Sequence, residues 1–326
     1  MSRDPKLICR VEKRKAGARV DQYLSGEIPD FSRSRLAKLV REKLVTVNGN
    51  TIKASYIVKE NDIVKINLPK DDIPGPSAEH IPLDIVYEDK NVIVIDKPAG
   101  MVVHPAANNN KETLVSALLD YYPEIKNAVV EKNNSISMMR AGIVHRLDKD
   151  TSGVMIVAKN KKALEYLSKE IKNRKIEKIY WALCLGWPEN ESGELTNYIG
   201  RHKVNRKQMA EIGEGNGRKA VSRYEVLKYF KDLAGQRFSL VEFDIETGRT
   251  HQIRLQSKLM GHPIAGDPVY NTKESIRHSK ELSATRQLLH AKQLSIRLPW
   301  SNKTETFSAD IPDDFEMALS RLTEIK

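Results

Sequence analysis

Residues 142–158 carry the pattern that decides the fold of the larger part of this chain. They read GIVHRLDKDTSG over 142–153 and VMIVA over 154–158, so two runs of β-type composition enclose a loop of charged and hydroxyl side chains. Strands that present such a loop are a common way to hold a reactive group rigidly. The same composition is also typical of an ordinary surface turn, and both interpretations stay open on these residues alone.

The segments around this loop do not form a regular βαβ repeat. Helical patterns cover residues 112–121 and 161–172, and β-type runs cover residues 83–89, 92–96, 179–185, 220–227 and 238–243. The later runs are separated by long loops rather than by the helices that a doubly wound parallel sheet requires. The pattern therefore predicts an α+β fold with a mixed, mainly antiparallel sheet and peripheral helices.

The positive charge of the chain is concentrated in its first part. The formal net charge is +11 over 326 residues, and residues 1–70 contain sixteen Lys and Arg against eight Asp and Glu. The length and the uneven charge together predict a small basic domain followed by a large, nearly neutral one. A basic module favours binding to a polyanion such as a nucleic acid, although a merely solvating surface has the same composition.

The basic segment has the pattern of a compact α/β unit. Helical patterns at residues 20–24 and 32–40 precede two β-type runs around the Asn-Gly pair at 48–49, which is a strong hairpin signal, and an alternating strand at 62–68. This layout resembles the αL RNA-binding domain known from the small-subunit ribosomal protein S-four.

This resemblance implies that the second helix of the basic segment contacts RNA phosphates. Leu36, Leu39 and Val40 form an apolar stripe on that helix. The cations expected to contact phosphates are Arg33, Arg35, Lys38 and Arg41. Such contacts would provide affinity and orientation but little sequence specificity. A solvated, charged helix face is the alternative.

The sequence suggests where the two domains meet. Residues 70–77 read KDDIPGPS, a stretch rich in charge and turn formers that is typical of a linker. We expect the αL-like domain to occupy residues 1–70, the linker residues 71–80 and the larger domain residues 81–326.

Other features of the sequence favour a soluble, cytoplasmic protein. No apolar run approaches the roughly 20 residues that a membrane span requires, and the charged N-terminus is not followed by the apolar stretch of a signal peptide. Cys9 and Cys184 fit no metal-binding or redox spacing, so we expect both to be reduced thiols.

Four motifs of the larger domain occur in a characteristic order. They read DKPAGMVVHP at 96–105, HRLD at 145–148 followed by TSG at 151–153, KIYWAL at 178–183 and TGRTHQIR at 247–254. This order resembles the RluA-type family of pseudouridine synthases, and the similarity spans residues 81–312. With the αL-like domain in front, the layout is closest to the large-subunit ribosomal RNA synthases of the RluD kind.

The resemblance implies that the chain isomerises uridine to pseudouridine in RNA. The bond between the ribose and the ring nitrogen breaks, the uracil turns, and carbon 5 joins the ribose without any redox change. We therefore expect no cofactor and no metal, and the sequence has no GxGxxG, no P-loop and no cluster of His and Cys. The reaction does need an ionised carboxylate beside the ribose. By resemblance this is Asp148, acting as nucleophile at the anomeric carbon or as base at the 2′ carbon.

A fixed cation is expected to keep that carboxylate charged. Enclosure by a nucleotide flipped out of the RNA favours protonation of Asp148, and a nearby guanidinium opposes it. Arg254 is the candidate, on the first turn of a helix predicted over 251–260 with Thr250 as its N-cap. We therefore predict an ion pair between Arg254 and Asp148 in the active site.

Three further side chains have expected roles. By resemblance, Tyr180 lines the pocket, stacks on the uracil and accepts the carbon 5 proton, whereas its alternating strand alone would make it a buried aromatic of the core. Arg146 is similar to the family arginine that fills the gap left by the flipped base, for which a planar guanidinium is suited. His145 is expected to make a scaffold hydrogen bond and to transfer no proton.

Cations and glycines recur together in two pieces that resemble the family's RNA-gripping loop. The pieces read RHKVNRK at 201–207 and GEGNGRK at 213–219. The cations expected to bind phosphates there are Arg201, Lys203, Arg206 and Lys207. A solvated hairpin is the alternative.

Three other classes of function share single features with this sequence. HRLD resembles the HRD of protein kinases, but it has an extra leucine, and the chain has neither DFG nor the kinase glycine loop. Asp150 beside Asp148 admits a glycoside hydrolase with two carboxylates, which would release free uracil. The αL-like domain alone would suit a non-catalytic RNA-binding or ribosome-assembly factor.

The expected partner is RNA. Large-subunit ribosomal RNA is the first choice, because of the domain layout, and tRNA is the second. We expect no obligate protein partner, a monomer and no membrane association.

Overall fold

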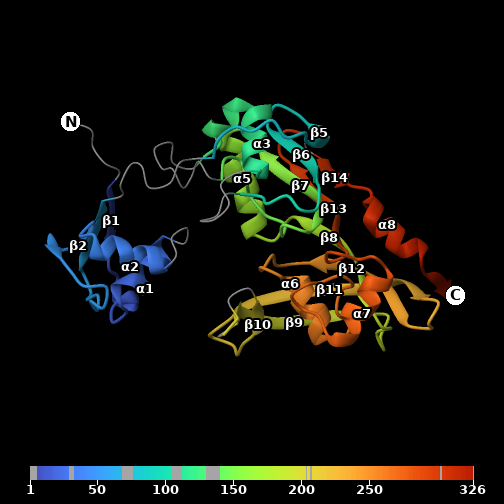
Figure 1. Ribbon diagram of the computed structural model, residues 1–326. Coiled ribbons are helices and arrows are strands. Elements are labelled where there is room, and N and C mark those ends of the chain that lie inside the picture. Colours follow the sequence, from blue (N-terminus) through green and yellow to red (C-terminus); the bar gives the residue numbers. More distant parts are fainter. Residues whose placement is uncertain are drawn as a thin grey trace. The chain divides into compact units, whose positions relative to one another are not determined.

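The computed structural model describes residues 6–28, 33–67, 76–104, 112–129, 140–202, 204–205, 208–301 and 303–325. The described residues form two compact units, one within residues 1–75 and the other within residues 76–326. Each unit has a sheet of its own (Figure 1).

In the part that the structure describes, the smaller unit is a four-stranded antiparallel sheet with two helices. Its elements are β1 (Lys6–Arg10), a 3₁₀ turn (Lys13–Lys15), α1 (Val20–Glu27), α2 (Arg33–Arg41), β2 (Val45–Val47), β3 (Asn50–Thr51) and β4 (Ile63–Asn67). The strand order is β1-β4-β2-β3. Asn48 and Gly49 have φ of 51° and 83°, and positive φ at both central residues is what a type I′ hairpin turn requires. The predicted hairpin is therefore present, whereas β1 was not predicted.

The core of the smaller unit lies between the helices and the sheet. Leu36, Leu39 and Val40 of α2 are buried, as their spacing predicted, and they join Leu24 of α1 and Val64 of β4 in one apolar cluster. The apolar stripe of α2 is thus used for packing, which leaves its charged side chains at the surface.

Among the described residues, the larger unit contains a sheet of eleven strands. They are β5 (Asp84–Glu88), β6 (Val92–Lys97), β7 (Ser152–Ala158), β8 (Glu177–Leu185), β9 (Ser192–Arg201), β10 (Met209–Glu211), β11 (Arg218–Lys231), β12 (Arg237–Ile245), β13 (Leu289–Leu298), β14 (Lys303–Ser308) and β15 (Thr323–Ile325). The main path runs β10-β9-β11-β12-β8-β13-β7-β6-β5, and β14 and β15 pair with β13 and β11. All pairs are antiparallel except β7 with β13. The predicted mixed, mainly antiparallel sheet is confirmed.

Helices cover this sheet at its periphery. They are α3 (Leu114–Tyr121), a 3₁₀ helix (Pro123–Asn127), α5 (Lys161–Lys172), α6 (Gln252–Leu259), α7 (Lys273–Glu281) and α8 (Asp313–Ser320). Alternate residues of β6 and β7 pack against α3 in one apolar cluster and against α5 in another, so the two helices cover opposite faces. This double cover explains why β7 is buried along its whole length. None of the helices in the described ranges is long and apolar enough to cross a membrane.

The β-type run before the charged loop is not a strand, contrary to expectation. Residues 142–144 contribute only an isolated bridge, between Ile143 and Val157. Gly142 has a φ of 72°, and a Cβ there would lie 2.3 Å from the carbonyl oxygen of Ala158. The chain therefore turns at Gly142 instead of extending along β7.

The loop at residues 145–151, here called the aspartate loop, leads directly into β7. Gly153, the second residue of β7, has a φ of 114°, and a Cβ there would lie 2.3 Å from the carbonyl oxygen of Ala291 on β13. Ala291 pairs with Gly153 on one side and with Tyr180 of β8 on the other. The lack of a side chain at Gly153 lets β13 lie close to β7. β13 is thus the single strand between β7, into which the aspartate loop leads, and Tyr180 on β8.

Candidate active site

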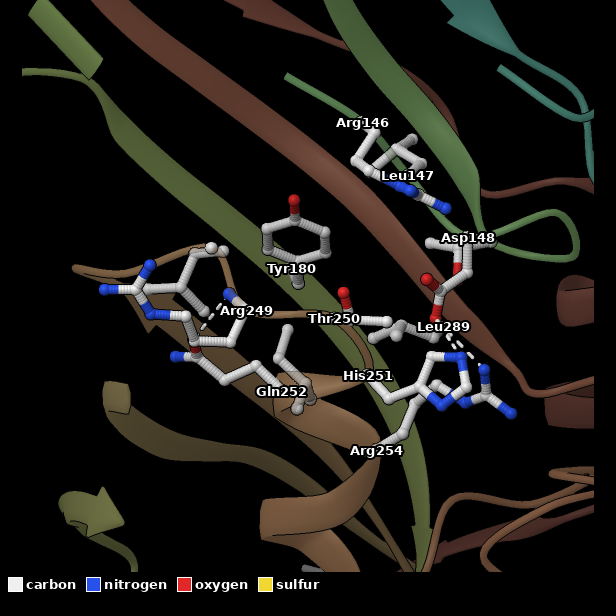
Figure 2. A pocket seen from close by; sticks show the side chains of 14 residues that line it. Arg146, Leu147, Asp148, Tyr180, Arg249, Thr250, His251, Gln252, Arg254 and Leu289 are labelled. Atoms are coloured by element: carbon white, nitrogen blue, oxygen red, sulfur yellow. Dashed lines mark hydrogen bonds and ion pairs between the residues drawn. The ribbon is translucent and has the colours of Figure 1, made fainter. Parts of the chain in front are cut away.

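A pocket lies where the aspartate loop meets β8, the end of β12 and the start of α6. Its lining includes Arg146, Asp148, Tyr180, His251 and Arg254 (Figure 2). Mostly apolar walls with a few convergent polar groups are typical of small-ligand sites. Among the described residues that line it, Asp148 is the sole carboxylate.

Asp148 and Arg254 form the ion pair that the sequence predicted. Arg254 Nη1 lies 3.0 Å from Asp148 Oδ2. The Arg254 side chain is only 5% exposed, whereas that of Asp148 is 18% exposed. The carboxylate is therefore reachable from the pocket, while its cation is held behind it.

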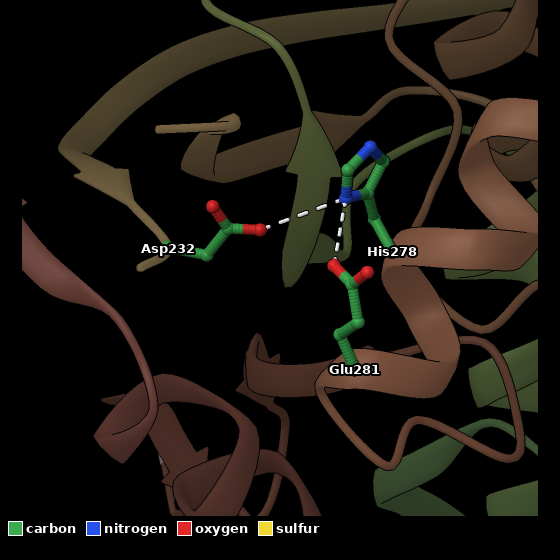
Figure 3. A group of neighbouring side chains, drawn as sticks. All are labelled: Asp232, His278 and Glu281. Carbon is green, nitrogen blue, oxygen red and sulfur yellow. Dashed lines mark hydrogen bonds and ion pairs between the residues drawn. The ribbon is translucent and has the colours of Figure 1, made fainter. Parts of the chain in front are cut away.

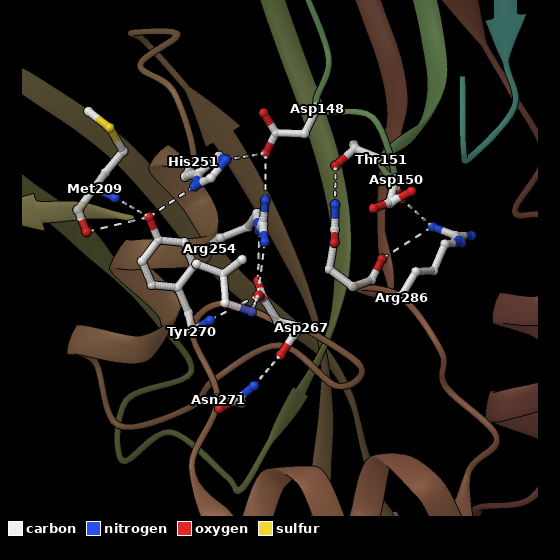
Figure 4. A network of polar contacts seen from close by, with 12 residues as sticks. Asp148, Asp150, Thr151, Met209, His251, Arg254, Asp267, Tyr270, Asn271 and Arg286 are labelled. Carbon is white, nitrogen blue, oxygen red and sulfur yellow. Dashed lines mark hydrogen bonds and ion pairs between the residues drawn. The ribbon is translucent and has the colours of Figure 1, made fainter. Parts of the chain in front are cut away.

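A second carboxylate, Asp267, fixes the orientation of Arg254 (Figure 4). Arg254 donates from Nε to Asp267 Oδ2 at 2.7 Å and from Nη2 to Oδ1 at 2.9 Å, a two-bond geometry that defines the plane of the guanidinium. Asp267 is itself held by the backbone N–H groups of Val269 and Tyr270 at 2.8 and 3.0 Å. The remaining nitrogen, Nη1, is thereby directed at Asp148.

The two carboxylates keep the buried Arg254 charged. Burial alone would lower the pKa of Arg254, but its hydrogen bonds to Asp267 and the charges of Asp267 and Asp148 raise it above the ordinary value. Burial also favours the neutral form of Asp267, and the hydrogen bonds and charge of Arg254 reverse this and lower its pKa. The pocket thus has a permanent positive charge directly behind Asp148.

The residue at the N-cap of α6 is not the one expected from the sequence. The N-cap is His251, with a left-handed φ of 55° and no capping bond from its side chain, so the prediction of Thr250 was wrong. The side chain of Gln252 instead stabilises the preceding turn, where its Oε1 accepts from Arg249 N at 3.0 Å and from Thr247 Oγ1 at 2.8 Å. Arg254 is the third residue of α6 and lies on its first turn, as predicted.

Tyr180 belongs to both the pocket and the core. Its ring packs in the main apolar cluster, it is 7% exposed, and it lines the pocket beside Asp148 (Figure 2). Burial, with the added effect of the negative charge of Asp148, raises the pKa of Tyr180. The side chain is therefore present as a phenol at neutral pH.

His145 and Arg146, the first two residues of the HRLD motif, have different surroundings. His145 Nε2 accepts a hydrogen bond from the backbone N–H of Ile156 at 3.1 Å, so the expected scaffold bond exists. Burial lowers the pKa of His145 to about 3, which keeps the ring neutral. Arg146 is exposed and lines the pocket.

Two buried cations that the sequence did not single out hold the aspartate loop in place. Lys97 is fully buried and donates to the carbonyls of Pro98, Met101 and Lys149 at 2.6, 3.0 and 3.1 Å; burial lowers its pKa to about 8. Arg286 donates to the carbonyl of Asp150 at 3.0 Å. Lys97 and Arg286 both donate to backbone carbonyl oxygens. Every residue has such an oxygen, so no sequence motif marks these contacts.

The cations predicted to bind phosphates are distributed over both units. Arg33 of α2 pairs with Asp21 at 3.1 Å, and Lys38 pairs with Glu42 at 3.5 Å, with 54% and 62% of the two cationic side chains exposed. Arg35 is half-buried and Arg41 exposed. Arg201 is exposed at the end of β9, opposite Met209 of β10. Lys203, Arg206 and Lys207 lie outside the described residues.

One group of potential metal ligands lies elsewhere in the described part of the chain (Figure 3). His278 Nδ1 is 3.0 Å from Glu281 Oε2 and 3.5 Å from Asp232 Oδ2. The other oxygen of Asp232 accepts from the backbone N–H groups of Ala234 and Gln236. A histidine N–H shared between two carboxylates accounts for this arrangement, which ties the turn between β11 and β12 to α7.

Two family models match the chain. The model described as RNA pseudouridylate synthase matches residues 91–258, and the model described as S4 domain matches residues 19–64. The first range contains the aspartate loop, Tyr180 and Arg254, and the second contains α1, α2 and the hairpin.

Individual relatives are similar over nearly the whole chain. An uncharacterized RNA pseudouridine synthase of Synechocystis sp. is 38% identical, over 94% of this chain and 90% of the relative. The ribosomal large subunit pseudouridine synthase D of Pseudomonas aeruginosa is also 38% identical, over 94% of this chain and 93% of that protein. The solved structure of human RNA pseudouridylate synthase domain containing 1 is 26% identical, with a TM-score of 0.58 over 78% of this chain and 91% of that one.

Proposed function

The chain belongs to the RNA pseudouridine synthase family, and from this premise we propose that it modifies uridines of large-subunit ribosomal RNA with Asp148 as its catalytic carboxylate. The activity is an isomerisation, in which the uracil is detached from the ribose and rejoined through carbon 5. We propose further that the target uridine is flipped out of the RNA into the pocket, since its reacting atoms are not accessible within a helix.

The observation that carries this proposal is the position of Asp148 in front of a clamped guanidinium. A guanidinium 3.0 Å from Asp148 stabilises negative charge at this position when a nucleotide displaces water from the pocket. An ionised carboxylate can attack the anomeric carbon or remove the 2′ proton, and both routes remain open.

The absence of a second carboxylate among the described pocket residues supports isomerisation over hydrolysis. A glycoside hydrolase needs two carboxyl groups across the scissile bond, one of them with room for water. Asp148 is the sole carboxylate of the described lining, and Asp267 is fully buried behind Arg254. The product discriminates the two reactions, because an isomerase leaves the mass of the RNA unchanged and a hydrolase releases uracil.

Tyr180 and Arg146 complete the proposed site. Tyr180 can stack on the uracil, and because it is a phenol it must pass on its own proton if it takes the one from carbon 5. Arg146 lies exposed at the pocket, where its planar guanidinium can occupy the gap left in the RNA by the flipped base.

The choice of ribosomal RNA rests on the relatives and on the N-terminal unit. A relative named ribosomal large subunit pseudouridine synthase D matches 94% of this chain, and the S4 match adds a basic RNA-binding module. We propose an RNA-binding domain over residues 1–70, a linker over 71–80 and a catalytic domain over 81–326. We further propose a cytoplasmic monomer without an obligate protein partner, with tRNA as the second choice of substrate.

Mapping of pseudouridine in total RNA tests the substrate. A strain that lacks the gene is expected to lose one or more pseudouridines from large-subunit ribosomal RNA, and the wild-type gene should restore them. The Asp148→Asn variant should restore none, which separates catalysis from a role as a non-catalytic assembly factor. Loss of pseudouridine from tRNA alone would contradict the choice of ribosomal RNA.

Removing two cations of α2 should weaken RNA binding and make its affinity less sensitive to salt. The double variant Lys38→Gln/Arg41→Gln is expected to reduce the slope of log K against log salt by about 2, because each lost phosphate contact removes close to one unit. The measurement is a filter-binding titration at several salt concentrations. The matched control is Lys53→Gln/Lys59→Gln, which removes the same charge from exposed positions of the same unit outside α2. Equal slopes for the two double variants would rule out α2 as the contact surface.

A further inference from the structure

We propose that His251 is a further catalytic residue, which donates a hydrogen bond from Nε2 to the uracil while the bond to the ribose breaks. This inference rests on the proposed function, since it requires a nucleotide at Asp148. Its basis is the position of the imidazole, the bond that orients it and the charge that develops in the reaction.

His251 presents a free donor position beside Asp148. The ring lines the pocket and is 18% exposed, the same fraction as the side chain of Asp148. Its Nε2 lies 3.8 Å from Asp148 Oδ2, too far for a hydrogen bond. Within the described residues, Nε2 has no hydrogen-bond partner, so it is available to a ligand that Asp148 engages.

The hydroxyl of Tyr270 determines which nitrogen of His251 carries the proton (Figure 4). Tyr270 Oη accepts a hydrogen bond from the backbone N–H of Met209 at 2.7 Å, so its own proton is free to be donated. The better acceptor is His251 Nδ1 at 3.0 Å, since the carbonyl of Met209 is 3.4 Å away. A ring that accepts at Nδ1 carries its proton on Nε2, which faces Asp148. Tyr270 is therefore a positioning residue for His251.

A neutral ring suits this site better than a charged one. Burial lowers the pKa of His251, the negative charge of Asp148 works against that shift, and the positive charge of Arg254 adds to it. A second cation here would compete with Arg254 for Asp148 and weaken the carboxylate as a nucleophile or base. A neutral N–H avoids this competition and still provides a hydrogen bond.

A hydrogen-bond donor at this position would stabilise the charge that develops in the reaction. When the bond between the anomeric carbon and N1 breaks, its electron pair stays with the uracil and spreads over N1 and the carbonyl oxygens. This holds whether Asp148 bonds to the anomeric carbon or removes the 2′ proton. A fixed donor aimed at the developing charge lowers the barrier of that step. When carbon 5 bonds to the ribose, Asp148 is released from the anomeric carbon or returns its proton to the 2′ carbon, and the ring becomes neutral. The proton that carbon 5 then loses is balanced by one that N1 takes up from solvent, so His251 needs to give up no proton.

The backbone at residue 251 allows a sharp test of this role. Its φ of 55° is a left-handed conformation that asparagine adopts more readily than glutamine. Glutamine, however, can place its amide nitrogen near the position of Nε2, which the shorter asparagine cannot reach. A donor role thus predicts that glutamine is the better substitute, and a purely structural role predicts the reverse.

The experiment compares His251→Gln and His251→Asn in the full-length enzyme, with kcat and KM measured on ribosomal RNA. We expect kcat within about 10-fold of wild type for glutamine and lower by about 100-fold for asparagine, with KM little changed in both. Equal kcat values for the two variants, or a higher value for asparagine, would overturn the proposal. So would a loss that appears only in KM.

Nitrogen-15 spectra of histidine-labelled protein provide a readout that does not depend on activity. Wild type should show His251 as a neutral ring protonated on Nε2, and Tyr270→Phe should shift the ring toward protonation on Nδ1 and lower kcat. A ring protonated on Nδ1 or on both nitrogens in wild type would overturn the proposal. If Asp148→Asn stays active, the proposed function fails. If Asp148→Asn is inactive and both His251 variants match wild type, only this inference fails.

Discussion

Asp148→Asn should abolish pseudouridine formation, with a fall in kcat on the order of 10⁴-fold or more, while the affinity for RNA stays within a few-fold of wild type. The amide has nearly the shape of the carboxylate but neither its charge nor its ability to form a bond or take a proton. The measurement is single-turnover pseudouridine formation together with a binding titration.

The fold should tolerate this change. Arg254 keeps both bonds to Asp267, so no buried cation is left without a partner. The matched control is Asp150→Asn, two residues along the same loop, because the structural contact of Asp150 with Arg286 uses its backbone carbonyl. We expect that control to remain active. Activity above about 1% of wild type in Asp148→Asn would exclude the proposed carboxylate role.

Asp267→Asn should produce the largest loss of stability among single changes in this site, about 3–5 kcal/mol of the free energy of unfolding. Asp267 is fully buried and accepts two hydrogen bonds from Arg254. An amide brings N–H groups toward one of those donors and leaves the buried guanidinium with the partly exposed Asp148 as its remaining charge partner in the described site. Because Arg254 then loses its orientation toward Asp148, kcat should fall as well. Denaturant unfolding and single-turnover kinetics measure the two effects.

The comparison for this prediction is Asp314→Asn. Asp314 also accepts two bonds from one arginine, Arg286, but 46% of its side chain is exposed. We expect a loss of about 1 kcal/mol or less, since exposed pairs contribute little. If the two variants lose similar stability, burial is not what makes the Asp267 pair important.

The pH dependence of the Asp267 effect has a definite sign. The pKa of Asp267 is lowered in the folded protein, so its ionised form stabilises the fold at neutral pH. That contribution begins to decline as the pH falls to the ordinary carboxyl value and is lost as it falls through the lower, folded pKa. The stability difference between wild type and Asp267→Asn should therefore be largest near neutral pH and shrink in acid.

Local sequence patterns predicted the elements whose conformation is decided by residues close together in the sequence. The helix over 161–172 has the predicted bounds. Its apolar stripe lies within the segment, and its N-cap is the residue directly before it, Asn160, which accepts a hydrogen bond from Ala163 N. The hairpin at 48–49 followed from the conformational demands of its turn. The turn at Gly142 and the left-handed His251 were not predicted, since both depend on residues distant in sequence.

The sequence by itself determined the composition of the site: the charged loop around Asp148, Tyr180 on a strand and Arg254 on the first turn of a helix. It also determined the basic N-terminal unit, because charge and periodicity are properties of the residues in order. Only the tertiary structure decided that Asp267 clamps Arg254, that Lys97 and Arg286 hold the aspartate loop, and that Tyr270 orients His251. These contacts join atoms far apart along the chain, several of them backbone carbonyls. Their directions are set by packing, which no local pattern encodes.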